Sequence, residues 1–181
     1  MGSQEAVTVA GDAAGLHVLV AGEADGYSWR TVATLGVAGT GTARWIGQAC
    51  VTGGGRRAVV VYAPAQITNS PDELGSGALA AVVNLATGAV TPVAAGVSIA
   101  YFDPGCGTGQ DAVLTQGGWA PRAGQVDQTR LMTLDAATGR ITRTIALPGE
   151  AASAVPYKGE SPPPTVGEFP LLTDGAGRQR S

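Results

Sequence analysis

The sequence predicts an all-β protein built from repeats, and two observations carry that prediction. The segment VNLATGAVT at 83–91 returns as LDAATGRIT at 134–142, and WIGQACVTG at 45–53 returns as YFDPGCGTG at 101–109. The chain has 28 glycines and 11 prolines among 181 residues, and they separate short apolar runs, as in proteins of many short strands. A repeat of about 50 residues with four strand-like segments is typical of a β-propeller blade. We therefore expect consecutive four-stranded antiparallel sheets in a partial β-propeller of about two and a half blades.

The start of the chain is expected to be irregular. Residues 1–14 are small and polar and predict a flexible N-terminus, ahead of a blade region that spans 15–158. The first expected strands are 16–21 and 29–35, with a turn between them that contains Asp-Gly, a common hairpin dipeptide. They predict the outer half of a blade whose first half is missing.

Two whole repeats follow, and each contains four strand-like segments. The expected strands are 44–52, 57–63, 78–85 and 89–94 in the first repeat, and 97–102, 112–116, 129–135 and 140–147 in the second. Residues 154–157 are expected to open a third repeat. The Pro/Gly-rich stretch at 159–181, which includes three consecutive prolines, predicts a flexible tail.

The turn chemistry repeats with the strands. Asn84 and Asp135 stand at matching positions just before Ala-Thr-Gly. Such side chains accept hydrogen bonds from backbone N–H groups two residues further on, and the glycine that follows adopts the positive φ that closes a hairpin. Gly88 and Gly139 are therefore expected to be structural.

The two cysteines, Cys50 and Cys106, occupy matching places, each in a Cys-x-Thr-Gly sequence. Matching places in adjacent repeats are neighbours in space, so a disulfide is geometrically feasible. It would close a loop of about 57 residues, worth roughly 4 kcal/mol in the chain-entropy model. The alternative is two buried free thiols with the same packing role in each blade, and both interpretations stay open. Two cysteines and one distant histidine do not make a standard zinc site.

The longest connections, at 64–77 and 117–128, join the second and third strands of each repeat. Both exceed what a hairpin needs, and binding residues tend to lie on such loops. Trp119 is the large aromatic without an evident core partner, so it either folds over a blade edge or is exposed to a ligand. The candidate contact residues are Asn69, Asp72, Trp119, Arg122 and Asp127.

Few residues could support catalysis or metal binding. His17 is the only histidine, it lies in an apolar strand where packing is expected, and no G-x-S-x-G motif is present. The glycine run at 105–109 resembles a phosphate loop, but no Lys-Ser/Thr follows it. Asp103 and Asp111 flank this run without the alternating oxygen ligands of a calcium loop. We expect no cofactor and no metal.

Charge and hydropathy narrow the expected partners. The net charge is −3 and no basic stripe is present, so nucleic acid is not expected. No apolar run reaches 18 residues, so no membrane span is expected. The first residues lack the basic start and apolar stretch of a signal peptide. The partners that remain are proteins or carbohydrates.

Three segments carry a resemblance: WIGQACVTGGGRRAVVVYAP at 45–64, AVVNLATGAVT at 81–91 and YFDPGCGTGQDAVLTQ at 101–116. They resemble the N-terminal β-propeller segment of large secreted actinobacterial proteins, some with Rhs-type or golvesin-like downstream domains, that are similar to polymorphic toxins or surface proteins. The resemblance extends over 16–157. It implies an extracellular or cell-surface binding or scaffold module and no catalytic residues.

The expected function is therefore a noncatalytic propeller-type module within a larger exported protein. The rival is a hydrolase or lyase with its site in the loops 64–77 and 117–128. An enzyme needs several titratable groups in one pocket, whereas a binding module needs an aromatic and polar rim; the scarcity of His, Lys, Tyr and Cys favours the module. Closed propellers have four to eight blades, so further blades or self-association are expected to cover exposed sheet faces.

Overall fold

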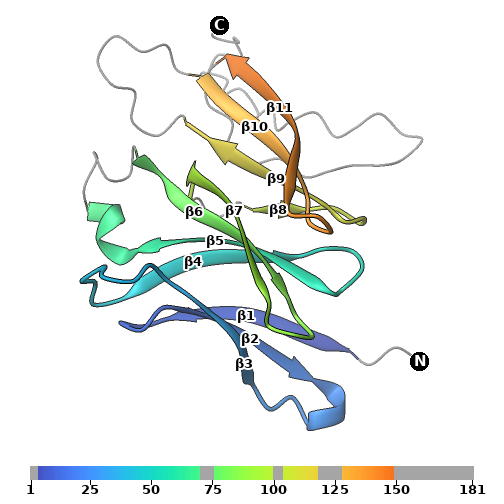
Figure 1. Cartoon of the computed structure of the whole chain (residues 1–181). Helices are drawn as coiled ribbons and strands as arrows, with labels where there is room; N and C mark the ends of the chain where they lie inside the picture. Colours follow the sequence, from blue (N-terminus) through green and yellow to red (C-terminus); the bar gives the residue numbers. More distant parts are fainter. Residues whose placement is uncertain (1–3, 70–75, 100–103, 118–127, 149–181) are drawn as a thin grey trace, which may run out of the picture.

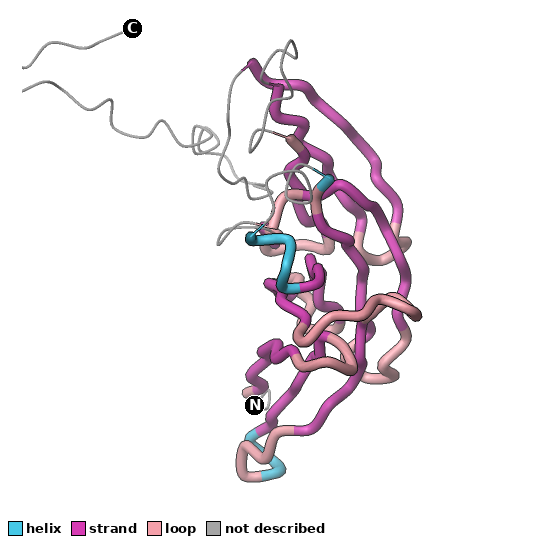
Figure 2. The backbone as a smooth tube through the Cα atoms, turned by 90° about the vertical axis from the view of Figure 1, so that its left-hand side faces the viewer, coloured by secondary structure: helices cyan, strands magenta, loops and turns pink. Residues whose placement is uncertain are grey.

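The computed structural model describes residues 4–69, 76–99, 104–117 and 128–148. Within these ranges the chain is all-β, as predicted, and forms three antiparallel sheets that lie one above another (Figure 1). Figure 2 shows that the strands bow in the same direction, so the stack is curved. In the described part of the chain the stack is open and does not close into a ring.

Each sheet is a simple meander in which consecutive strands pair. The first sheet contains β1 (Glu5–Gly11), β2 (Leu16–Gly22) and β3 (Arg30–Leu35). The second contains β4 (Trp45–Val51), β5 (Arg57–Pro64), β6 (Ala78–Asn84) and β7 (Val90–Val97). The third contains β8 (Gly105–Cys106), β9 (Asp111–Gln116), β10 (Gln128–Asp135) and β11 (Arg140–Pro148). Two short 3-10 helices, η1 (Glu23–Asp25) and η2 (Ala65–Asn69), lie between strands.

The two central strands of the second sheet, β5 and β6, are buried on both faces, which explains their continuous apolar runs. In β5, Ala58 and Val60 face the core shared with the first sheet. Val59 and Val61 face the core shared with the third sheet. All four are fully buried. A strand that is covered on both sides has no polar face, so the alternation expected of a half-exposed strand disappears.

The repeated turn chemistry is confirmed. Asn84 Oδ1 accepts a hydrogen bond from the N–H two residues on at 3.0 Å, and Asp135 Oδ1 does the same at 2.8 Å. Gly88 and Gly139 adopt φ values of 73° and 70°. A hydrogen bond from the Thr138 hydroxyl is the main reason that the pKa of Asp135 lies below its ordinary value.

Three sequence-based expectations need correction. The N-terminus is not flexible throughout 1–14, because Glu5–Gly11 form β1 and pair in register with β2. The first sheet therefore has three strands, not the two of a half blade. The strand expected at 97–102 is also wrong in its position: Val97 ends β7, and the first strand of the third sheet is the two-residue β8.

Candidate binding groove between the first and second sheets

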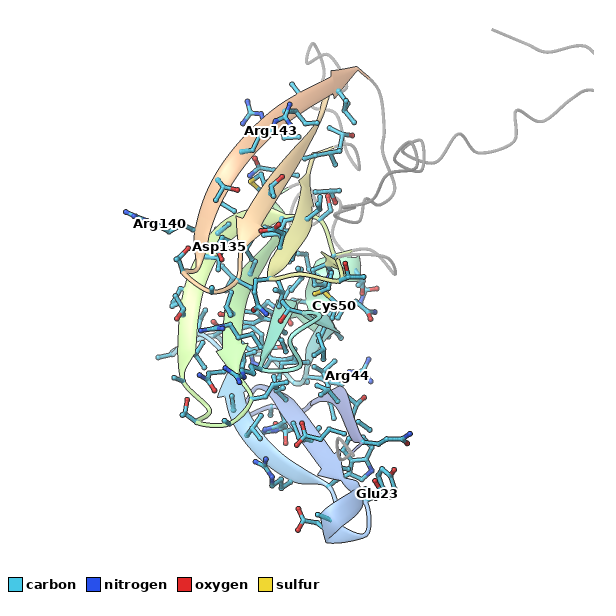
Figure 3. The ribbon with its side chains drawn as sticks, turned by 90° about the vertical axis from the view of Figure 1, so that its right-hand side faces the viewer. Glu23, Arg44, Cys50, Asp135, Arg140 and Arg143 are labelled. Atoms are coloured by element: carbon cyan, nitrogen blue, oxygen red, sulfur yellow. A yellow bond between two sulfur atoms is a disulfide. The ribbon has the colours of Figure 1, made fainter. Side chains whose placement is uncertain are left out.

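A cavity of about 400 Å³ lies where the first sheet meets the second. The end of β1 and the start of β4 form its two long walls. Figure 3 places Arg44, beside this groove, and Cys50 on one side of the stack, and Arg140 on the opposite side. The lining residues are Val9, Ala10, Gly11, Leu16, Arg44, Trp45, Ile46, Gly47, Gln48 and Ile99.

Glycines allow the two walls to approach. A Cβ on Gly11 would overlap the carbonyl group of Trp45, and one on Gly47 would overlap the Leu16 side chain. The backbones are joined at this point, because the Trp45 N–H donates to the Asp12 carbonyl at 3.0 Å. Trp45 is 3% exposed and its ring centroid lies 6.0 Å from that of Tyr62. These contacts hold the end of β1 against the start of β4.

The lining of the groove is mostly apolar. Among the described residues that line it, Arg44 is the only charged one, and Gln48 is the other exposed polar side chain. The remaining lining consists of aliphatic side chains, Trp45 and backbone. General acid–base catalysis and covalent catalysis need a titratable or nucleophilic group in reach of the substrate. These lining residues supply none, so the groove can recognise a ligand through shape, backbone hydrogen bonds and one positive charge.

A second polar cluster lies on the first sheet, outside the groove lining. His17 Nε2 is 3.0 Å from Asp12 Oδ2, and His17 Nδ1 is 2.9 Å from the Thr34 hydroxyl. The hydrogen bond from His17 is the main reason that the pKa of Asp12 lies below its ordinary value. Asp12 Oδ1 also accepts from the N–H groups of Ala14 and Gly15, which closes the β1–β2 turn. The cluster thus fixes this turn to β3, and we assign it a structural role.

The residues predicted as contacts are only partly placed. Asn69 is exposed at the end of η2. Asp72, Trp119, Arg122 and Asp127 lie outside the described residues, so their role stays a prediction. Of the two alternatives for the cysteines, the structure has the disulfide: Cys50 and Cys106 are bonded, with their Cα atoms 5.6 Å apart.

Neither the groove nor two exposed aromatic residues of the first sheet was predicted from the sequence. Tyr27 and Trp29, between β2 and β3, are 46% and 52% exposed. The available signal for the groove was Gly47 in the middle of an otherwise strand-like segment, since glycine in a strand marks close approach of another backbone. Arg44 precedes that segment, but an isolated arginine gives no pattern.

No three His, Cys, Asp or Glu side chains among the described residues are grouped to hold a metal ion. In the same part of the chain, no helix is long and apolar enough to cross a membrane. No family model, no curated protein and no solved structure matches this chain.

Proposed function

We propose that this chain is a noncatalytic binding or scaffold module of the β-propeller type, part of a larger exported protein, and that the groove between β1 and β4 is its recognition site. The propeller architecture is supported by three consecutive meander sheets stacked face to face. A closed propeller has four to eight such sheets, so a stack of three fits a part of a larger ring.

The observation that carries the proposal is the lining of the groove. It combines apolar side chains, backbone from two strands and the single charge of Arg44. Ligand sites are typically apolar with a few polar groups that fix orientation. The ligand class that matches this lining is a protein segment or a carbohydrate, held without a chemical step.

The disulfide supports the exported location. A bond between Cys50 and Cys106 joins the second sheet to the third. Disulfides persist in oxidising environments and are rare in the reducing cytosol. The disulfide is thus compatible with the proposed location in the extracellular space or at the cell surface.

A binding screen with matched variants tests the function. The immobilised protein is exposed to panels of glycans and of extended peptides, and each hit is titrated against Arg44→Ala/Gln48→Ala and against Arg140→Ala. Both substituted groove residues are exposed, so folding is expected to be preserved. We expect the groove variant to lose roughly tenfold or more in affinity, as for a central contact residue, and Arg140→Ala to bind like the wild type.

Two results would overturn the proposal. One is turnover of a bound ligand, seen as product release that the groove variant abolishes. The other is binding that neither variant changes, because the recognition site would then lie elsewhere.

A further inference from the structure

Strand β1 corresponds to β5 and β9, the second strands of the other two sheets. Glu5-Ala6-Val7, Arg57-Ala58-Val59 and Asp111-Ala112-Val113 have the same form, a charged residue followed by Ala-Val. Their registers agree as well: Glu5 pairs with Gly22, Arg57 with Asn84 and Asp111 with Asp135, in each case the residue that ends the next strand.

The far edges of the sheets correspond in the same way. A Cβ on Gly88, in the β6–β7 turn, would overlap Val32 of β3, and a Cβ on Gly139, in the β10–β11 turn, would lie 2.8 Å from Thr91 of β7. Each hairpin thus packs on the last strand of the preceding sheet, so β3 matches β7. The first sheet therefore has equivalents of the second, third and fourth strands. The equivalent of β4 and β8 is missing among the described residues.

The exposure of matching side chains in β1 and β5 shows which edge of the first sheet is uncovered. Val7 and Val9 pack against the core shared with the second sheet, as Val59 and Val61 face the core shared with the third. Val59 and Val61 are fully buried, whereas Val7 and Val9 are only half-buried. Both pairs of valines face a neighbouring sheet. The greater exposure of Val7 and Val9 therefore comes from the edge of β1, where no strand pairs with it among the described residues. The groove runs along the C-terminal half of that edge, at Val9, Ala10 and Gly11.

The edges of the stack are also protected unequally. Natural sheets block exposed edges with proline, charged residues or bulges. The three strands at the far edges all have such features. Strand β3 has one register shift in its pairing, and β7 has two register shifts and also contains Pro92. Strand β11 has one register shift and contains Arg140 and Arg143. Strand β1 pairs with β2 over seven residues without a shift, contains no proline, and has Glu5 at its start as its one charged residue. Strand β4 has the same features at the corresponding edge of the second sheet, without a charged residue. The free edge of β1 is thus suited to pairing.

We propose that the free edge of β1 binds an extended polypeptide strand supplied by a separate partner chain, which pairs antiparallel to β1 and fills the groove. Added strands obtain affinity from backbone hydrogen bonds and specificity from alternate side chains. Strand β4 indicates which side chains suit the added strand. Its Ile46 and Cys50 are apolar and partly buried, and they lie four residues apart on the same face. The partner strand carries small or apolar side chains at those places and an acidic side chain that faces Arg44.

This inference deepens the proposed function and rests on it only in treating the groove as a binding site. The probe is a synthetic peptide with the sequence of residues 43–52 and Cys50→Ser, the chain's own inner strand. The protein is titrated with it while amide hydrogen exchange is followed by NMR. We expect saturable binding and protection of those amides of 5–11 that do not donate to β2, with little change in β3. A peptide that is N-methylated at alternate residues on the pairing edge keeps its side chains and is expected not to bind.

The charge of the partner is tested with a second peptide that also carries Arg44→Glu. It is expected to bind the wild-type protein roughly two- to fivefold more tightly than the parent peptide, as for an exposed ion pair. The advantage should vanish with the protein variant Arg44→Ala. Equal binding of both peptides to the wild type would overturn the acidic assignment.

The other outcomes of the peptide titration distinguish between possible occupants of the β1 edge. If neither peptide binds and the amides of 5–11 that do not donate to β2 exchange rapidly, the strand site does not exist. If those amides are protected without peptide, another segment already occupies the edge, and sedimentation identifies it. An oligomer indicates a second copy of the chain, and a monomer indicates residues 149–181 of the same chain. Either result overturns the proposal of a separate partner. Ligand turnover in the assays described above would end the proposed function but leave the strand site intact.

Discussion

At the residue scale, glycine has two separate tasks that the structure distinguishes. Gly55 and Gly88 both have a positive φ, of 67° and 73°. Around Gly55 a Cβ would meet nothing within 4 Å, whereas at Gly88 it would overlap the Val32 carbonyl of the preceding sheet. One glycine serves only its turn, and the other also allows two sheets to touch.

Alanine substitutions separate these tasks. We expect Gly55→Ala to destabilise the protein by about 1 kcal/mol, the cost of an unfavourable φ. Gly88→Ala should cost roughly 2–4 kcal/mol, because overpacking against Val32 adds to that cost. Chemical denaturation measures both free energies of unfolding. Equal losses for the two variants would mean that the sheets do not meet at Gly88.

The carboxylate of Asp12 predicts a pH dependence. Its pKa is lowered in the folded state, chiefly by the hydrogen bond from His17. A lowered folded-state pKa contributes stability that is complete above the ordinary carboxyl pKa of about 4 and is lost as the pH falls through the lowered value. The stability difference between wild type and Asp12→Asn should therefore shrink from pH 6 to pH 2.5. A constant difference in denaturation midpoint would contradict this.

At the element scale, the strands that the sequence predicted well are those whose own residues decide the outcome. Asn84 and Gly88 fix a hairpin locally, and the apolar run of β5 admits no exposed face. Strand β8 is different, because Gly105 and Cys106 have little strand preference of their own. Its place depends on the disulfide and on the Gly53 N–H that donates to the Gly109 carbonyl, and both contacts come from another sheet.

The signal for β1 was present but too short to recognise alone. Glu5-Ala6-Val7 matches Arg57-Ala58-Val59, yet the flanking residues are small and polar. The groove was less predictable still, since its walls come from β1 and β4, and nothing local relates Val9 to Arg44. A site assembled between sheets depends on the stacking geometry, which repeats indicate only in outline.

Docking of the first sheet on the second depends on Trp45. Its side chain is almost fully buried and packs near Gly36 and Tyr62. We expect Trp45→Ala to lower the free energy of unfolding by roughly 3–5 kcal/mol, the usual cost of deleting a buried aromatic ring. Trp29→Ala is the matched control, because Trp29 is half exposed, and it should change stability by less than about 0.5 kcal/mol. Similar effects of the two substitutions would argue against this packing.

At the scale of the whole molecule, the described sheets form a row in which the second sheet lies between the first and the third. The stability of such arrays is close to a sum of unit and interface terms, so interfaces can open separately. The outer face of the first sheet carries Thr8, His17 and Thr34 beside Leu19, so it is partly polar.

Removal of the disulfide should therefore loosen one end of the stack first. We expect Cys50→Ser/Cys106→Ser to lose up to about 4 kcal/mol, the loop-closure term. Hydrogen exchange of 105–116 and 128–148 should accelerate more than that of 16–35, because Trp45 still holds the first sheet. Reductant on the wild type should reproduce the pattern. Uniform acceleration would mean that the three sheets unfold as one unit.

The same bond sets how the module would respond to mechanical tension. A pull on its two ends would pass from β4 through the sulfur atoms to β8, and β5, β6 and β7 would lie in a covalent loop off that route. The cysteines are 56 positions apart in the sequence. At about 3.5 Å per extended residue at most, roughly 190 Å of chain could not be extended while the disulfide is intact. The middle sheet would be shielded from load, and a reducing environment would release that length.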